Sequence, residues 1–144
     1  SGMIAGQVMD LANEERSATA DDLAATDRLK TGELIRAAAV MGCIAAGASG
    51  EQTAAAEGYC AAVGLAFQIV DDILDVTSSE SVLGKPIGSD SGNGKSTYVS
   101  LLGLERSGEL AAELTDKAKS ALDIFGDEGE FLAELADKLS SRKS

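Results

Sequence analysis

The residues best suited to chemistry form an acidic run, Asp71-Asp72-x-x-Asp75, inside an apolar segment over residues 68–75. On a helix, side chains three and four residues apart share a face, so the three carboxylates are predicted to project to nearly one side. Like charges at this spacing repel, and the C-terminal part of a helix disfavours anions further. A compensating cation is therefore expected. Mg2+ is the best candidate, because it binds one or two carboxylates and leaves positions for phosphate oxygens.

A solvated acidic helix end is the alternative interpretation of this run, because short motif matches are often misleading. The neighbouring residues favour the metal hypothesis, since they are apolar and predict a mostly buried helix. They are Leu65, Ile69, Val70, Ile73, Leu74 and Val76. The polar face of such a helix is expected to line a cavity rather than bulk water.

Residues 78–96 are rich in glycine and serine and contain the only proline, Pro86. They predict a long loop, and loops of more than about 12–15 residues are often functional. Within this segment, residues 91–97 end in Gly-Lys-Ser-Thr and invite comparison with a phosphate-binding P-loop. The spacing argues against that comparison, because the first glycine of the motif would fall on Ser89. A P-loop also follows a buried strand, whereas a helix is expected here.

Composition indicates one domain with an aliphatic, all-helical core. The 144 residues are enough to bury a sizeable core, and 44% are hydrophobic but only 3% aromatic. The formal net charge of −12 disfavours binding to nucleic acid or to anionic membranes, which requires basic surface. The uncharged stretches are too short to cross a bilayer and no signal-like leader is visible, so a cytoplasmic protein without a membrane span is expected.

Two cysteines, Cys43 and Cys60, lie in helical patterns without Cys-x-x-Cys spacing, and the chain has no histidine. A zinc site therefore lacks ligands. We expect both cysteines to be buried thiols in a reducing compartment.

Apolar periodicity and capping residues predict an antiparallel helical bundle. Helices are expected over residues 2–13, 19–48, 49–77, 97–103, 105–125 and 128–142. Capping boxes are expected at Thr19 and Asp22, at Ser49 and Gln52, and at Asp127 and Glu130. Because only a short turn at residues 47–50 joins the two longest helices, these two must pack antiparallel.

Four motifs follow one another in a specific order, and together they resemble a known family. They are Gly6-Gln7-x-x-Asp10-Leu11, Lys30-Thr31, Phe67-Gln68-x-x-Asp71-Asp72-x-x-Asp75, and Gly84-Lys85-x-x-Gly88-x-Asp90-x-x-x-x-Lys95-Ser96-Thr97-Tyr98. This order resembles the trans-isoprenyl diphosphate synthases, the farnesyl and geranylgeranyl diphosphate synthase family, and within it the bacterial short- to medium-chain branch. The resemblance implies the isoprenoid synthase fold, with residues 1–144 as its C-terminal half. The family's first aspartate-rich motif and isopentenyl diphosphate site would then lie upstream of Ser1.

The resemblance implies a prenyltransferase that ionises an allylic diphosphate with Mg2+, or with Mn2+ in its place, and joins it to isopentenyl diphosphate by 1'-4 condensation. It makes Lys30, Thr31, Gln68 and Asp71 the catalytic residues. The implied metal ligands are Asp71, Asp72 and Asp75, and the implied diphosphate contacts are Lys30, Lys85 and Lys95. Phe67 and Gln7 would line the substrate pocket. Lys30, Gln68 and the three aspartates are expected to face one groove.

A noncatalytic helical interaction or regulatory subunit of the same fold is the alternative function. The acidic run favours an enzyme, because a purely structural subunit has no need of such costly like charges. Without the upstream half, the chain by itself is expected to be inactive. The exposed apolar surface of half a bundle predicts association, either with a separate N-terminal half or as a homo-oligomer.

Overall fold

The computed structural model describes residues 2–14, 17–83 and 96–142, and the side chains of residues 2–14, 17–77 and 96–142. Every regular element in these ranges is helical, which confirms the predicted all-α class. The elements are α1 (Met3–Glu14), α2 (Ala20–Asp27), η1 (Arg28–Gly32), α3 (Glu33–Ala46), α4 (Gly50–Leu83), α5 (Tyr98–Leu102), α6 (Leu104–Ala121), η2 (Asp123–Gly129) and α7 (Glu130–Ser140). None of the described helices is long and apolar enough to cross a membrane.

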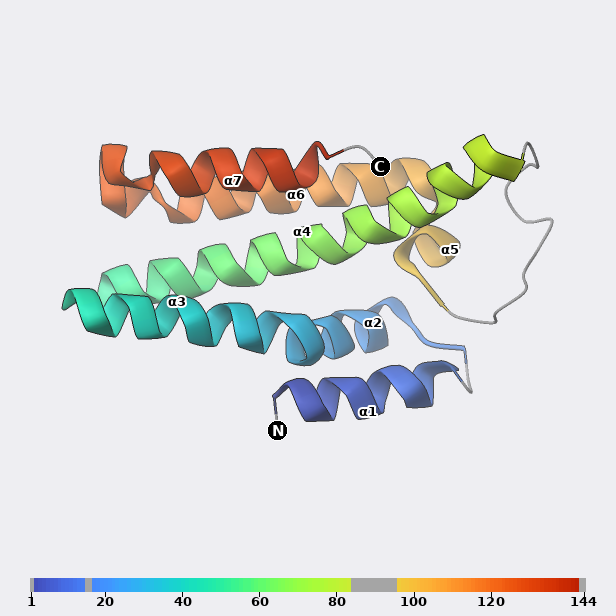
Figure 1. Cartoon of the computed structure of the whole chain (residues 1–144), viewed down its shortest axis with the longest axis horizontal. Coiled ribbons are helices and arrows are strands. Elements are labelled where there is room, and N and C mark those ends of the chain that lie inside the picture. The colour runs from blue at the N-terminus through green and yellow to red at the C-terminus, as the bar shows by residue number, and fades with distance from the viewer. Residues whose placement is uncertain (1, 15–16, 84–95, 143–144) are drawn as a thin grey trace.

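The helices form a layered bundle with α4 at its centre (Figure 1). One side of α4 faces the row made by α2, η1 and α3, with α1 beyond that row, and the other side faces α6 and α7. α4 runs antiparallel to α3, as the short connection predicts. The layering leaves α4 in contact with elements from both ends of the chain.

Two apolar clusters hold α4 to its neighbours. In the first, Tyr59, Cys60, Ala62 and Val63 pack with residues of α6, η2 and α7, and in the second, Ile69 and Val70 pack with residues of α5 and α6. An apolar stripe on the last helices takes part in both clusters; it comprises Leu110, Leu114, Ala118, Leu122 and Phe125. Cys60 is buried as expected, whereas Cys43 is only half-buried, and both thiols are free.

Two of the three predicted capping boxes are confirmed. The Asp22 N–H donates to the Thr19 hydroxyl over 3.2 Å, and the Thr19 N–H donates to the Asp22 carboxylate over 3.0 Å. Ser49 and Gln52 exchange the corresponding bonds over 3.1 and 2.9 Å. Between them, Gly47 ends α3 in the left-handed region, with φ of 69°.

The third capping box, at Asp127 and Glu130, was wrong. Residues 123–129 form a 3-10 helix, and α7 begins at Glu130 without a side-chain cap. The physical reason is Gly126, whose φ of 53° and ψ of −136° turn the chain sharply before the expected helix start.

The predicted end of the central helix was also wrong, since α4 continues through Leu83 instead of stopping near Thr77. The first glycine and proline after residue 77 stand at positions 84 and 86, so the serines before them do not interrupt the helix. The rest of the predicted loop, residues 84–95, lies outside the described residues.

Candidate functional site

The acidic run lies on α4, where the neighbouring helices separate its first two carboxylates. Asp71 and Asp72 are half-buried and contact different elements, whereas Asp75 is exposed. The run therefore does not face one partner. Each of its first two carboxylates has its own environment.

Asp72 is oriented by α5. One of its oxygens, Oδ2, accepts a hydrogen bond from the backbone N–H of Tyr98 over 2.8 Å. Tyr98 is the first residue of α5, whose start is fixed by reciprocal bonds of 2.9 and 3.1 Å between Thr97 and Ser100. N–H groups at a helix start have no partner within the helix, so the carboxylate satisfies one of them. This bond fixes the orientation of the Asp72 carboxylate at the start of α5.

Asp71 faces the end of α7. Its Oδ1 pairs with the guanidinium of Arg142, which also donates to the Phe67 carbonyl oxygen over 3.3 Å. The same guanidinium lies 4.1 Å from the centroid of the Phe67 ring, a cation–π contact. The compensating cation that the acidic run requires is therefore supplied, for Asp71, by a residue from the end of the chain.

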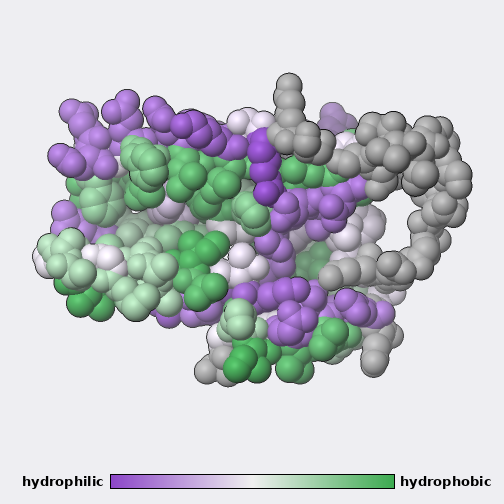
Figure 2. Space-filling model, viewed as in Figure 1, coloured by the Kyte–Doolittle hydropathy of each residue, from purple (hydrophilic) through white to green (hydrophobic). Residues whose placement is uncertain are grey.

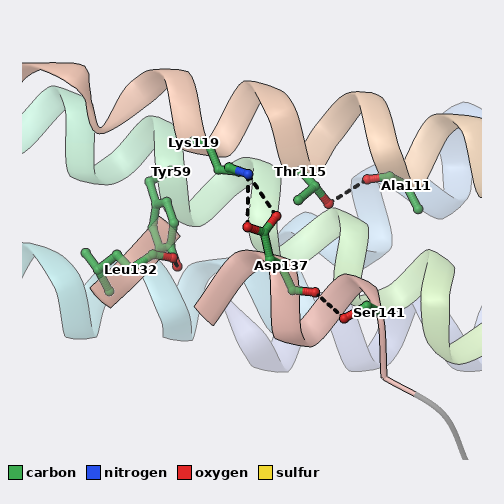
Figure 3. A network of polar contacts seen from close by, with 7 residues as sticks. All are labelled: Tyr59, Ala111, Thr115, Lys119, Leu132, Asp137 and Ser141. Carbon is green, nitrogen blue, oxygen red and sulfur yellow. Dashed lines mark hydrogen bonds and ion pairs between the residues drawn. The ribbon is translucent and has the colours of Figure 1, made fainter. Parts of the chain in front are cut away.

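A polar network connects α7, which precedes Arg142, to α6 and α4 (Figure 3). Lys119 on α6 pairs with the Asp137 carboxylate over 2.9 and 3.0 Å, and the Ser141 hydroxyl donates to the Asp137 carbonyl over 2.7 Å. The Tyr59 hydroxyl of α4 donates to the Leu132 carbonyl over 2.8 Å. Burial raises the pKa of this phenol to about 12, so it remains a donor.

Lys30 lies on η1, a π-helical turn between α2 and α3. Such turns occur frequently at functional sites. The Lys30 ammonium group pairs with Asp10 of α1 over 2.6 Å, and their side chains are 34% and 14% exposed. A second acidic residue, Asp27, lies close to this pair.

Asp27 interacts electrostatically with both Lys30 and Asp72 of the acidic run. Burial and, after it, the negative charge of Asp72 raise the pKa of the Asp27 carboxyl from 3.8 to about 6, while Lys30 opposes the shift. Burial and, after it, the charge of Asp27 also raise the pKa of the Tyr98 phenol. The Tyr98 hydroxyl lies close enough to Asp27 to act on the pKa of its carboxyl, but it makes no hydrogen bond of ordinary geometry among the described residues. Asp10, Asp27, Lys30 and Asp72 thus form one electrostatic cluster, which we call the lysine cluster.

The predicted site residues divide between two places. Lys30 and Asp72 belong to the lysine cluster, whereas Phe67 and Asp71 contact Arg142. Thr31 and Gln68 are half-buried, on η1 and α4, and Gln7 is exposed on α1. Lys85 and Lys95 lie outside the described residues.

Sequence reasoning assigned no role to three residues that the structure brings into the site. Asp10 belongs to the motif that begins at Gly6, and Asp27 lies three residues before Lys30 on the same helical row. The sequence pattern could therefore have indicated both as site residues. No sequence pattern indicated Arg142, apart from its place at the end of the last predicted helix.

A cavity of about 620 Å3 opens between α2, η1, α3, α4 and α6. Its wall includes Asp27, Arg36 and Leu65 but none of the three residues of the acidic run. The predicted cavity beside the acidic run therefore differs from this one.

The donor set fits a metal ion held jointly by protein and ligand. Among the described side chains, no three aspartates, glutamates or cysteines converge on a ready-made metal site. Mg2+ needs no such cage, because it retains waters and uses one or two carboxylates together with phosphate oxygens. Asp71 and Asp72 are the two carboxylates of the acidic run that could take part in that arrangement.

Comparison with known proteins identifies the family. The chain matches the family model described as polyprenyl synthetase over residues 1–126. It is 40% identical to the farnesyl diphosphate synthase of Escherichia coli (strain K12), covering 99% of this chain and 49% of that protein. It is 38% identical to the geranylgeranyl diphosphate synthase of Cyanophora paradoxa, covering 100% of this chain and 48% of that protein. The chain therefore belongs to the polyprenyl synthetase family, and it spans about half the length of the curated relatives it matches.

A solved structure agrees with this assignment. The geranyltransferase of Helicobacter pylori, complexed with magnesium and isoprenyl diphosphate, superposes with a TM-score of 0.72 at 34% identity. The match covers 96% of this chain and 45% of that one. Family and fold are thus supported independently by sequence and by structure.

Proposed function

We propose that this chain forms the C-terminal half of the active site of a prenyltransferase, which condenses an allylic diphosphate with isopentenyl diphosphate. The observation that carries the proposal is that the Lys30 ammonium group, held by Asp10 over 2.6 Å, and the Asp72 carboxylate both act electrostatically on one carboxyl, Asp27, from different helices of the bundle. An ammonium group held near carboxylates suits a diphosphate that is bound with a metal ion. The names of the relatives support the same reaction.

We assign roles to the site residues according to their charge. Lys30 would contact the diphosphate directly, while Asp71 and Asp72 would hold Mg2+, or Mn2+ in its place, with Asp75 acting through water. Bound metal would supply positive charge that stabilises the departing diphosphate. Preorganised charge of this kind is usually the largest contribution to catalysis. Thr31 and Gln68 would face the allylic cation, and Phe67 and Gln7 would line the substrate pocket, with Lys85 and Lys95 as further diphosphate contacts.

The test is prenyl transfer by a protein that joins this chain to an N-terminal half with the first aspartate-rich motif. We expect turnover with Mg2+ and both diphosphates from the joined protein and none from the 144-residue chain. Asp71→Asn and Asp72→Asn should each lower kcat by at least ~100-fold. Asp116→Asn is the matched control, because Asp116 is exposed on α6, away from these residues. Normal turnover by the Asp71 and Asp72 variants would contradict the assigned roles.

The alternative, a noncatalytic interaction or regulatory subunit, predicts no turnover even from the joined protein. The same assay therefore separates the two functions. An active joined protein that loses activity only in the α4 variants would exclude the noncatalytic alternative.

We propose further that the protein acts in the cytoplasm and associates, either with a separate N-terminal half or with copies of itself. Support for association comes from the apolar residues that α1 exposes, which Figure 2 shows in green along the lower edge of the molecule. They are Met3, Ile4, Val8 and Leu11, between 52% and 72% exposed. Patches of this kind are usually covered by a partner.

A further inference from the structure

Gly6 of α1 lies against the backbone of the turn that carries Lys30. A Cβ atom built on Gly6 would come within 2.2 Å of the Lys30 nitrogen, 2.5 Å of its Cα and 2.7 Å of the Leu29 carbonyl carbon. Non-bonded carbon atoms normally stay about 3.5–4.0 Å apart. These neighbours are backbone atoms, which cannot rotate out of the way as a side chain could. Only glycine fits at this position while α1 and η1 stay where they are.

Gly6 is the first of three contacts on one face of α1. Four residues on, Asp10 pairs with the Lys30 ammonium group over 2.6 Å. Three residues further, the Asn13 amide donates to the Thr26 hydroxyl over 3.0 Å, and both of these side chains are buried. Residues spaced by four and then three lie on one helical stripe. This stripe of α1 therefore holds η1 and the end of α2 along its whole length.

A side chain at position 6 would disturb the contacts that Asp10 and Asn13 make. To accommodate a methyl group at Gly6, α1 or η1 would have to move by about 1 Å. The Lys30–Asp10 pair is already at 2.6 Å and bridges the same two elements, so it cannot survive such a shift unchanged. Displacements of about 1 Å in groups that position a substrate can cost ~100-fold in rate.

We propose that Gly6 is a positioning residue for Lys30: its missing side chain lets α1 approach η1 closely enough for Asp10 to hold the Lys30 ammonium group. The catalytic consequence rests on the proposed function, in which that ammonium group contacts diphosphate. The positional part does not rest on it, because Gly6, Asp10 and Lys30 all belong to described parts of this chain.

The test measures the reactivity of Lys30 directly. The chain is acetylated with an amine-reactive ester, and the rate at each lysine is followed by peptide mass spectrometry. In Gly6→Ala we expect Lys30 to react at least fivefold faster, with Lys119 and Lys138 within twofold of their usual rates. Equal acceleration at all lysines, or an unchanged rate at Lys30, would overturn the proposal.

Two variants keep the result interpretable. Gly42→Ala is the matched control, since Gly42 is also helical and a Cβ there meets nothing within 4 Å; Lys30 should react at its usual rate. Asp10→Asn removes the ion pair without altering the backbone, and it decides the outcome if Gly6→Ala does not fold. Faster reaction of Lys30 in Asp10→Asn supports the proposal, and an unchanged rate contradicts it.

The catalytic consequence is measured in the joined protein. Gly6→Ala should raise KM for the allylic diphosphate at least tenfold and leave KM for isopentenyl diphosphate within twofold. Absence of turnover in the unsubstituted joined protein would overturn the proposed function but not the role of Gly6, which the acetylation rates decide. An unchanged KM together with faster acetylation would remove the diphosphate contact from Lys30.

Discussion

The guanidinium of Arg142 pairs with the Asp71 carboxylate and covers the ring of Phe67 one turn away on α4. A residue that follows the last helix, α7, thus lies at the carboxylate for which the sequence predicts a metal ion. The Arg142 guanidinium and a metal ion would compete for the Asp71 carboxylate.

Removing the Arg142 guanidinium should make the stability of the fold depend on metal. We expect Arg142→Gln to lower the free energy of unfolding by about 0.5–1.5 kcal/mol, because a partly exposed ion pair and a cation–π contact are lost. Millimolar Mg2+ should restore more stability to the variant than to the unsubstituted chain. Urea titrations with Mg2+ and with EDTA measure the difference. Arg106→Gln, which removes a solvent-exposed arginine pairing with Glu109 and Glu113, serves as the control without a metal effect.

Asp27 should make folding sensitive to pH between about 4 and 6. Its pKa is raised from 3.8 to about 6 in the folded chain, so the folded state binds the proton more tightly than the unfolded state. Stability should therefore fall as pH rises from about 4 to 6, and the penalty should persist above pH 6, at about 1–2 kcal/mol after allowance for partial exposure. Asp27→Asn should remove this slope in urea titrations. An unchanged slope would show that Asp27 titrates normally.

The two tyrosines should respond in opposite ways to loss of their hydroxyls. Tyr59→Phe removes the donor to the Leu132 carbonyl, and we expect it to cost about 1–2 kcal/mol of unfolding free energy. Tyr98→Phe removes a buried hydroxyl that makes no hydrogen bond of ordinary geometry among the described residues, so it should be neutral or stabilising. Urea unfolding of both variants tests the pair. A loss in Tyr98→Phe as large as in Tyr59→Phe would place a hydrogen bond between Tyr98 and Asp27.

The apolar face of α1 should control association. Light scattering of the purified chain is expected to give a mass above 14.6 kDa, or a bound companion polypeptide, because Ile4 and Val8 are 72% and 62% exposed. Ile4→Gln combined with Val8→Gln should reduce the association. Phe131→Gln is the control, since Phe131 is 73% exposed on α7, at the opposite side of the bundle (Figure 1). A compact monomer before any substitution would contradict the prediction.

Local sequence signals predicted most of the helices, because caps and breakers act over a few residues. Thr19 with Asp22, and Ser49 with Gln52, form the bonds that their spacing predicts. The error at residue 127 arose because Gly126 adopts a backbone conformation that its neighbours do not specify. Glycine is compatible with a helix or with a break, and only the packing of η2 decides between them.

The site was less predictable, because its contacts join distant segments. The acidic run and Lys30 could be recognised as charged residues in helices. The pairing of Asp71 with Arg142, and of Lys30 with Asp10, depends on how α7 and α1 pack. Helical periodicity gives the face on which a side chain lies but not the helix that meets it.

α1 carries opposite chemistry on its two sides. Its inner stripe of Gly6, Asp10 and Asn13 touches the turn that holds Lys30, whereas its outer stripe is apolar and bare. A helix is only about 10 Å across, so a partner that packs on the outer stripe lies one helix thickness from the lysine backbone. A change in how tightly that partner packs on α1 would shift the Lys30 ammonium group relative to the Asp10 carboxylate. Through this single helix, assembly of the protein would be linked to the position of the Lys30 ammonium group.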